Sequence, residues 1–435
     1  MKEYPYWWEA VPNLKLKSQK SEVRTEAPLL PARVDVAIIG AGYTGLSAAR
    51  HLARTGASVV VLEREDVGWG ASSRNGGQVL TGLKLDPATL VERYGESAAR
   101  RLFDASIESI ERLETLIASE AIDCGYRRSG HVHAACKASH FEGLREEQAL
   151  LARVFGHRVE IVPRSEQRSE LGSDAYHGLL VDERSGSLDP ARYVQGLAEA
   201  AARAGATVVT ATPVERVTPP RAGAKHWRVA TSIGEVEATD VLMATNGYTN
   251  GALPALQRRF VPVGSYIITT EPLPDQRAMA ILPTRRMAFD SRHFLHYFRV
   301  TDDRRLLFGG RAEFSRPAPD TTHRAADILR RDMLTVFPEL SAVAIDYAWG
   351  GNVAFTRDEL PHAGRLDGAY YAGGYAGHGI AMATTLGELV ARRIAGEPID
   401  HPLMNDRFSA IPFYNGRPWF LPLVGMYYRL LDAVD

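Results

Sequence analysis

The stretch from residue 34 to residue 64 constrains the fold of this chain more than any other. An apolar, β-branched run at 34–39 leads into a loop with GxGxxG spacing, whose residues are Gly40, Ala41, Gly42, Tyr43, Thr44 and Gly45. Residues 46–54 have a helical pattern, and a second apolar run at 58–62 ends at Glu63. The order strand, glycine loop, helix, strand and acidic residue predicts a βαβ unit that binds a dinucleotide.

Each glycine of this loop is expected at its position for a steric reason. Gly40 permits the tight turn, Gly42 lets the backbone approach a pyrophosphate, and Gly45 allows the helix to pack closely on the strand. The helix N-terminus then presents free N–H groups and a partial positive charge to the phosphates. Glu63 is placed to hydrogen-bond a pair of ribose hydroxyls. By itself the unit leaves NAD, NADP and FAD open.

Composition and charge exclude several classes of protein. The 435 residues suggest about two domains, and 45% hydrophobic with 24% charged residues is typical of a globular protein. A net charge of −1 provides no basic surface for nucleic acid. Cys124 and Cys136 do not make a disulfide framework, which suggests reduced thiols of an intracellular protein. Because no signal peptide or membrane-spanning run is evident, we expect a cytoplasmic location.

A second glycine-rich stretch follows directly, at residues 68–82 (GWGASSRNGGQVLTG). Its glycines and small polar residues offer many N–H donors and let a planar ring or a phosphate approach closely. A flexible linker is the alternative. The position immediately after the dinucleotide unit favours a loop that contacts the cofactor.

The remaining pattern predicts two domains that alternate along the chain. A largely helical insertion interrupts the nucleotide-binding domain, and a strand-rich segment with a hairpin turn at Thr301–Asp303 interrupts it again. We assign the nucleotide-binding domain to residues 34–82, 187–257 and 346–399, and a substrate domain to residues 83–186 and 258–345. Residues 1–33 form an arm that packs on the surface or borders a substrate entrance. Residues 400–435 form a tail that packs on the body; contact with a membrane interface is the alternative.

Residues 370–396 repeat the order of strand, glycine turn and helix seen in the first unit. A short strand, AYYAGG, enters a glycine turn, and a helix starts near Ile380. The dipole of that helix would stabilise negative charge in front of it. A reduced flavin carries such charge at its pyrimidine end, whereas an NAD-binding fold has no evident need for a second helix of this kind.

On these motifs the chain resembles the D-amino acid oxidase-like family of FAD-dependent oxidoreductases, and within it the amine oxidases of the γ-glutamylputrescine oxidase type. The resemblance covers about residues 34–396, and the motifs that carry it are IIGAGYTGLSAARHLARTGASVVVLE, GWGASSRNGGQV, PVERV, VLMATNGYT, FGGR and GGYAGHGI. It implies an α/β fold, with a Rossmann-like FAD-binding domain of the glutathione-reductase type. It also implies an α+β substrate domain built around an antiparallel sheet.

The resemblance further implies the residues that contact FAD. The loop at 40–45, with Glu63 and Arg64, would hold the ADP part, and Val214 would contact the adenine side. The ADP part would also be lined by Ala244, Thr245 and Gly247. The flavin and pyrophosphate would be wrapped by Gly70, Ala71, Ser72, Arg74, Asn75, Gly76, Gly77 and Gln78. The pyrimidine ring would face Gly374, Gly377, His378, Gly379 and Ile380, although His378 could be a mere spacer between glycines.

Two departures from relatives in the family bear on cofactor and substrate. Relatives with covalent flavin use a histidine near the second loop or a C-terminal cysteine, and this chain has neither, so we expect non-covalent FAD. Glycine-oxidase-like relatives carry an arginine for the α-carboxylate, and the comparable stretch, residues 349–353, lacks one. This favours an amine over a simple α-amino acid.

Candidates for the substrate side lie on the strand-rich segment. Arg299 is predicted as a clamp for a substrate carboxylate, because guanidinium binds carboxylate in a bidentate way; a surface salt bridge beside Asp302 and Asp303 is the alternative. Tyr297 shares its face of the strand by alternation. Tyr266 and Trp349 are further candidates, with core packing as the alternative for each. The histidines His131, His133 and His140 have no ligand set that would predict a metal site.

The function predicted from the resemblance is hydride transfer from the carbon bearing nitrogen to flavin N5, with hydrolysis of the imine. The reoxidant stays open between oxygen and another acceptor, since some oxidase relatives use a lysine near the flavin and no lysine follows Lys225. A sarcosine-, pipecolate- or D-amino-acid-type enzyme and a non-catalytic flavin-binding subunit are the alternatives. The oligomeric state stays open.

Overall fold

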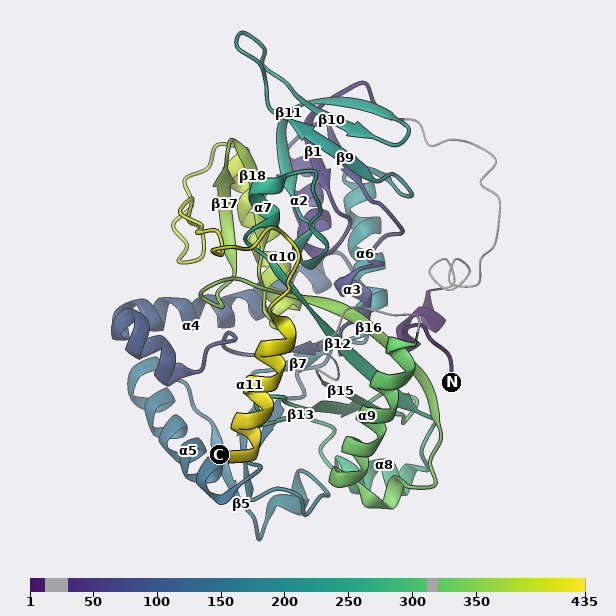
Figure 1. Cartoon of the computed structure of the whole chain (residues 1–435), viewed down its shortest axis with the longest axis vertical. Helices are drawn as coiled ribbons and strands as arrows, with labels where there is room; N and C mark the ends of the chain where they lie inside the picture. The colour runs from purple at the N-terminus through teal and green to yellow at the C-terminus, as the bar shows by residue number, and fades with distance from the viewer. Residues whose placement is uncertain (12–29, 311–319, 435) are drawn as a thin grey trace.

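The computed structural model describes residues 1–11, 30–310 and 320–434. Its two large sheets lie towards opposite ends of an elongated molecule (Figure 1). Most of the N-terminal arm (12–29) and residues 311–319 of the predicted substrate domain, including the arginine of the FGGR motif, lie outside the described residues.

The first sheet is the predicted nucleotide-binding sheet. Its central path is mostly parallel and runs β17 (His362–Leu366), β18 (Ala369–Gly373), β11 (Gly234–Met243), β1 (Arg33–Ile39), β2 (Val59–Leu62) and β8 (Thr207–Val209). The antiparallel strands β9 (Val214–Thr218) and β10 (Trp227–Thr231) extend from β11. Strand β2 and residues 36–39 of β1 are apolar because both of their faces are buried. Helices cover one face, and side chains of β9 and β10 pack against the other.

Three helices pack around the glycine loop that follows β1. Helix α2 (Tyr43–Arg54) lies between α6 (Pro190–Arg203) and α10 (Gly379–Ile394) (Figure 1). A Cβ atom on Gly387 of α10 would lie 2.3 Å from the backbone oxygen of Thr44, so the two helices touch through backbone. Ser47 of α2 donates a hydrogen bond to the Thr384 carbonyl of α10 at 2.7 Å. These contacts bring the two predicted cofactor motifs together, although more than three hundred residues separate them.

The second sheet carries the predicted substrate side. Its order is β16 (Ile345–Phe355), β12 (Val261–Thr270), β15 (Leu306–Gly310), β14 (Tyr297–Val300), β13 (Met287–Asp290), β4 (His131–Ala134), β6 (Gly178–Asp182) and β5 (Glu160–Pro163). All neighbours are antiparallel except β13 and β4. The predicted hairpin is present, since β14 pairs with β15 across the turn after Val300. The fold class is therefore the predicted one.

Smaller elements complete the chain. Near the cofactor loops lie η1 (Tyr6–Ala10), α3 (Ala71–Arg74), η4 (Asn246–Tyr248), α7 (Pro254–Gln257) and the ribbon of β3 (Gln78–Val79) with β7 (Gly186–Ser187). The substrate side carries α4 (Pro87–Ser119), α5 (Ala138–Leu150), η2 (Leu151–Phe155), η3 (Gln167–Ser169), α8 (Asp275–Ile281), α9 (Thr321–Val336) and η5 (Pro338–Leu340). Helix α11 (Leu421–Val434) ends the described chain. No helix in these described ranges combines the length and apolarity needed to cross a membrane.

One domain boundary needs correction. Strand β16 pairs with β12 from Ile345 to Phe355, so residues 346–355 lie in the second sheet and not in the nucleotide-binding sheet. The start of the tail packs on the body, because Leu403 and Phe408 are buried and the Tyr414 hydroxyl donates to the Phe260 carbonyl at 2.9 Å. The other boundaries stay a prediction.

A buried ionic network joins the second sheet to α9. His296 lies 3.3 Å from an Asp290 oxygen through Nδ1 and 3.4 Å from an Asp332 oxygen through Nε2. Burial lowers the pKa of His296, as does the Arg292 guanidinium 2.7 Å from Nδ1, but the hydrogen bonds to the two carboxylates outweigh both and raise it to about 9. The protonated imidazole therefore stabilises the folded state.

Stability should fall as pH rises. The pKa of His296 is higher in the folded than in the unfolded chain, so its contribution is full below about pH 6.5 and is lost as pH rises through about 9. We expect His296→Gln to remove on the order of 2 kcal/mol at pH 6 and to flatten this slope. Urea unfolding between pH 6 and 9.5 measures the free energy of unfolding and its slope with pH. His323→Gln is the control, since that α9 side chain is 60% exposed. If the free energy of unfolding of His296→Gln has the same slope with pH as that of the wild type, protonated His296 is not the source of the slope.

Candidate active site

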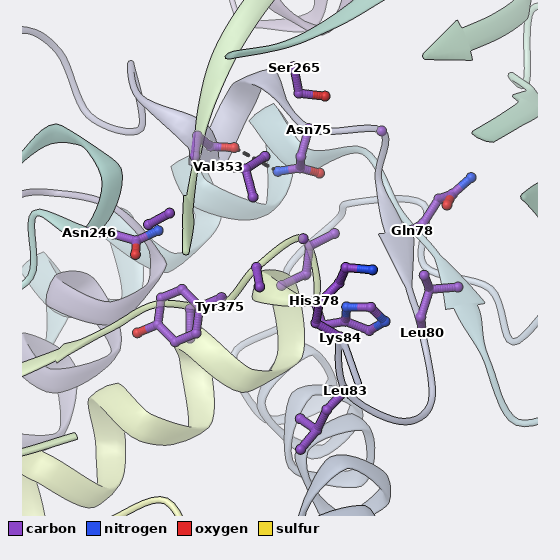
Figure 2. Close-up of a pocket in the computed structure, with 18 of the residues that line it drawn as sticks. Asn75, Gln78, Leu80, Leu83, Lys84, Asn246, Ser265, Val353, Tyr375 and His378 are labelled. Carbon is purple, nitrogen blue, oxygen red and sulfur yellow. Dashed lines mark hydrogen bonds between the residues drawn. The ribbon is translucent and has the colours of Figure 1, made fainter. Parts of the chain in front are cut away.

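A cavity of about 550 Å³ runs from the glycine loop after β1 to the second sheet. Its walls come from the two predicted cofactor loops, the start of α10, the chain between β3 and α4, helix α5 and strands β4 and β13. Segments far apart in the sequence thus meet around one space (Figure 2).

The first glycine loop has the geometry that the dinucleotide pattern requires. Gly40 has a φ of +106°, and a Cβ there would lie 2.9 Å from the Ala244 backbone oxygen. A Cβ on Gly45 would lie 2.0 Å from the Gly40 oxygen, so only glycine lets α2 pack this closely. Gly42 borders the cavity and faces Ser72, whose hydroxyl accepts from the Tyr43 N–H at 3.1 Å.

Glu63 holds the loop from the neighbouring strand. Its carboxylate accepts hydrogen bonds from the Ala41 N–H at 2.8 Å and from the Glu65 N–H at 2.9 Å. Burial raises the pKa of Glu63, and these two hydrogen bonds oppose that shift. The carboxylate also borders the cavity, so it retains acceptor sites for the hydroxyl groups of a ribose.

The N-terminal arm and β16 brace the second cofactor loop from behind. Trp7 donates its indole N–H to the Asn75 carbonyl at 2.9 Å, and Trp8 donates to the Ser73 hydroxyl at 2.8 Å. Trp349 donates to the Arg74 carbonyl at 2.9 Å. The Arg74 guanidinium lies 4.4 Å from the Trp69 ring and 4.8 Å from the Trp8 ring. The described start of the arm, residues 1–11, therefore packs on the body and fixes the loop.

Removing one of these indole donors should weaken cofactor binding. Trp8→Phe deletes a buried hydrogen bond worth about 1 kcal/mol, so we expect FAD to dissociate about fivefold more readily. Titration of the apoprotein with FAD, followed by flavin fluorescence, measures the change. Trp419→Phe is the control, because that ring is 60% exposed. An unchanged affinity in Trp8→Phe would mean that the arm merely covers the surface.

The second glycine turn ends where α10 begins, at Gly379. His378 precedes the helix and lies next to Lys84 (Figure 2). Burial, then Lys84 and His131, lower the pKa of His378 to about 3, so the ring is neutral. Its Nδ1 atom is buried without a hydrogen-bond partner, as is Nε2 of Gln78, and both side chains border the cavity. A molecule bound in the cavity would supply hydrogen-bond partners for both atoms.

Most of the predicted FAD contacts border this one cavity. They are Gly40, Gly42, Tyr43, Thr44, Glu63, Arg64, Gly70, Ala71, Ser72, Arg74, Asn75, Gly76, Gln78, Val214, Ala244, Thr245, Gly377, His378, Gly379 and Ile380. The glycine cradle, the unpartnered polar atoms and the helix N-terminus fit FAD.

Five predicted contacts do not border the cavity and instead shape its walls. The Ala41 N–H is bonded to Glu63, and Gly45 packs beneath Gly40. The Gly77 carbonyl accepts from Arg299, Gly247 lies against Asn352, and Gly374 packs on Thr356.

The substrate-side predictions need correction at three residues. Arg299 is buried away from the cavity, where its guanidinium donates to the carbonyls of Gly77 at 2.9 Å and Leu188 at 3.0 Å. It therefore holds the cofactor loop, and it is not placed to clamp a substrate carboxylate in this cavity. Trp349 lies behind the same loop, and the Tyr266 ring packs on Gly350 of β16, outside the cavity wall. Tyr297 does border the cavity, with its hydroxyl 3.4 Å from that of Ser265.

Several cavity residues were missed from the sequence. The polar ones include Lys84, His133, Glu147, Ser265, Arg292 and Asn352, and the apolar ones include Leu83, Phe103, Leu151 and Phe289. One feature of the sequence could have pointed to Lys84 as a cavity residue. The chain holds only seven lysines, and this one follows the second glycine loop. Among the described residues, no group of three or more His, Cys, Asp or Glu side chains is arranged to hold a metal ion.

Comparisons with known proteins agree with this geometry. The family model described as "FAD dependent oxidoreductase" (DAO) matches residues 35–393. Gamma-glutamylputrescine oxidoreductase from Escherichia coli K12 is 34% identical over 414 residues, which are 92% of this chain and 93% of that protein. A probable oxidoreductase, OrdL, from Haemophilus influenzae is 35% identical over 370 residues, or 83% of each chain.

Solved structures agree with the fold. Glycine oxidase from Geobacillus kaustophilus superposes with a TM-score of 0.70 at 21% identity, over 89% of this chain and 99% of that one. L-proline dehydrogenase from P. horikoshii superposes with a TM-score of 0.68 at 20% identity, over 86% of this chain and 96% of that one. These likenesses confirm the predicted fold class.

Proposed function

The chain belongs to the DAO family of FAD-dependent oxidoreductases, and we propose that it oxidises a C–N bond of an extended amine similar to γ-glutamylputrescine. Membership of the family confirms FAD as the cofactor and oxidoreduction of an amine or amino acid as the activity. The γ-glutamylputrescine-like substrate is the proposed part. The observation that carries it is the lining of the cavity, which includes residues of α4 and α5 besides those of the cofactor loops.

FAD, when bound, supplies the hydride acceptor. The chain's own residues then have separate tasks. The N-terminal N–H groups of α10 would hold the pyrimidine end of the flavin and stabilise negative charge there. Lys84 places a positive charge in the cavity next to His378, and a nearby positive charge lowers the pKa of a substrate amine. The neutral amine, which can release hydride, is therefore favoured.

An extended amine suits the side chains that border the cavity. Part of the cavity wall is apolar and would pack against methylene groups of the substrate; it includes Leu83, Phe103 and Leu151. Arg292 borders the cavity, but its guanidinium donates to Asp290 at 2.7 Å. Arg299 donates to backbone carbonyls outside the cavity, so it is not placed to hold the carboxylate of a simple α-amino acid.

A second candidate function is oxidation of an amino acid, and Lys84 is the observation that favours it. Its ammonium group could hold a substrate carboxylate near the cofactor loops. Lys84→Met separates the two candidates. An amino acid oxidase should lose most of its kcat/KM in this variant, whereas an amine oxidase should mainly shift its pH profile to higher pH.

Turnover across a substrate panel tests the proposed substrate class. The panel contains γ-glutamylputrescine, putrescine, sarcosine, pipecolate and D-amino acids, each assayed with oxygen and with an artificial dye as acceptor. We expect kcat/KM to be at least about tenfold higher for γ-glutamylputrescine than for any α-amino acid. Faster turnover of sarcosine, pipecolate or a D-amino acid would overturn the proposal. The ratio of peroxide formed to dye reduced separates an oxidase from a dehydrogenase.

We also propose that FAD is held without a covalent bond. Neither Cys124 nor Cys136 borders the cavity, and the second glycine loop at residues 68–82 contains no histidine. Acid precipitation should therefore release all of the flavin into the supernatant, where its absorbance is measured. Flavin that stays with the pellet would contradict non-covalent binding.

A further inference from the structure

We infer that the part of the cavity bordered by α5 binds a second cationic group of the substrate, and that Glu147 recognises it. This inference rests on the proposed function and deepens it, because it names the substrate class as amines with a remote ammonium group. It assigns a specificity-determining role to a residue that no sequence motif singles out.

The first observation is the position of Glu147. It is half-buried on α5, and it borders the same cavity as the cofactor loops. Leu151 lies one helical turn further along and also borders the cavity. Phe103 and Leu83 are further apolar residues that border the same cavity. The carboxylate thus lies at an apolar surface, where a charge without a partner is costly.

The second observation is that no cation compensates Glu147. In the described part of the chain its carboxylate makes no ion pair and no hydrogen bond. Burial, then the charges of Asp86 and Asp182, raise the pKa of Glu147 to about 7. Asp182 is already bonded to His157 at 2.7 Å, and Asp86 caps α4 through the Thr89 N–H at 2.8 Å. Glu147 is therefore the carboxylate of the three that is left for a ligand.

The third observation is that opposite charges are separated within the cavity. Lys84 acts on His378 and His133, next to the cofactor loops, and it does not contribute to the shift of Glu147. An ammonium group is disfavoured near Lys84 and favoured near Glu147. A substrate with two amino groups and an apolar chain between them would therefore bind in one direction, with its neutral amine near Lys84 and its ammonium at Glu147.

Binding and reduction measured separately test this inference. The probes are 1,4-diaminobutane and γ-glutamylputrescine, which carry a second ammonium group, and butylamine, which does not. Anaerobic calorimetry gives the dissociation constant of each amine, and stopped-flow absorbance gives the limiting rate of flavin reduction. The variants are Glu147→Gln, which removes the charge, Glu147→Asp, which keeps it, and Glu146→Gln. Glu146 is the matched control, because it is the exposed neighbour on the same helix and does not border the cavity.

We expect Glu147→Gln to raise the dissociation constants of the two probes with two ammonium groups about tenfold or more. The value for butylamine and the limiting reduction rates should stay within about twofold, and Glu147→Asp should restore most of the affinity. Glu146→Gln should leave every value unchanged. Equal weakening of all three amines, or no change for the two diammonium probes, would overturn the inference.

The two proposals fail in distinguishable ways. If no amine reduces the flavin of the wild-type protein, the proposed function fails, and calorimetry still decides whether Glu147 selects amines with a second ammonium group. If amines reduce the flavin but Glu147→Gln leaves the preference for such amines intact, only the inference fails. Flavin content and circular dichroism confirm that each variant is folded.

Discussion

Replacing Gly42 with valine should yield a folded protein that purifies with less than about a tenth of the wild-type flavin. A Cβ at this position would lie 2.9 Å from the Ser72 hydroxyl, and the added methyl groups would fill space beside the loop where phosphates are expected. The Ser72 hydroxyl cannot retreat without breaking its bond to the Tyr43 N–H. The absorbance ratio at about 450 and 280 nm after desalting measures the flavin content, and circular dichroism measures the fold.

Gly251→Val is the control for Gly42→Val. Gly251 is exposed, and a Cβ there meets no atom within 4 Å. This variant should keep its flavin and its unfolding midpoint. Full flavin content in Gly42→Val would show that the loop after β1 is not the cradle of the cofactor.

The second large effect is expected for Asp182, which holds the wall of the cavity. Its carboxylate accepts from His157 at 2.7 Å, from the Thr81 hydroxyl at 2.6 Å and from the Arg184 N–H at 2.8 Å. Removing the carboxylate would leave these three donors without their acceptor, and a buried unsatisfied polar group typically costs about 1–3 kcal/mol. We therefore expect Asp182→Ala to lower the free energy of unfolding by about 3 kcal/mol or more at pH 7, measured by urea unfolding.

The stabilisation by Asp182 should depend on pH in a definite direction. Burial raises the pKa of Asp182, but the hydrogen bond from His157 and the charges of His131 and His157 outweigh it and lower the pKa to about 2. A lowered pKa means that the stabilisation is full above about pH 4 and is lost as pH falls through about 2. The difference between wild type and Asp182→Ala should therefore shrink in acid.

Glu183→Ala is the matched control for Asp182→Ala. It is the next residue, and its side chain is 67% exposed, so its pairing with Arg286 should contribute less than about 1 kcal/mol. Equal losses in the two variants would mean that the buried pair contributes no more than a surface pair.

The cofactor side of the site could be predicted from sequence because its determinants are local. The loop at 40–45, Glu63 and the start of α10 each follow from a strand, a turn and a helix in immediate succession. Other residues that hold the cofactor loops lie outside such motifs, and Trp7 and Trp8 are examples. Their indole bonds to the second loop join segments that are more than sixty residues apart, and no periodicity encodes that contact.

The substrate side could be predicted only in part. Alternation along β14 correctly groups Tyr297 with Arg299 on one face, but it does not say which end of that face meets a cavity. The second glycine loop covers Arg299, so only Tyr297 is left in the wall. Glu147 lies on a helix whose placement depends on tertiary packing. Because the pattern of β16 resembles any buried strand, its pairing with β12 could not be read from the sequence either.

The most direct test of the central claim is anaerobic titration of the purified holoprotein with γ-glutamylputrescine. An FAD-dependent amine oxidoreductase should lose the flavin absorbance near 450 nm, with one equivalent of amine consumed per flavin and the imine-derived carbonyl released. Admission of oxygen or a dye should restore the oxidised spectrum. A flavin spectrum that neither this amine nor any other member of the panel bleaches would contradict the claim and indicate a non-catalytic flavin-binding subunit.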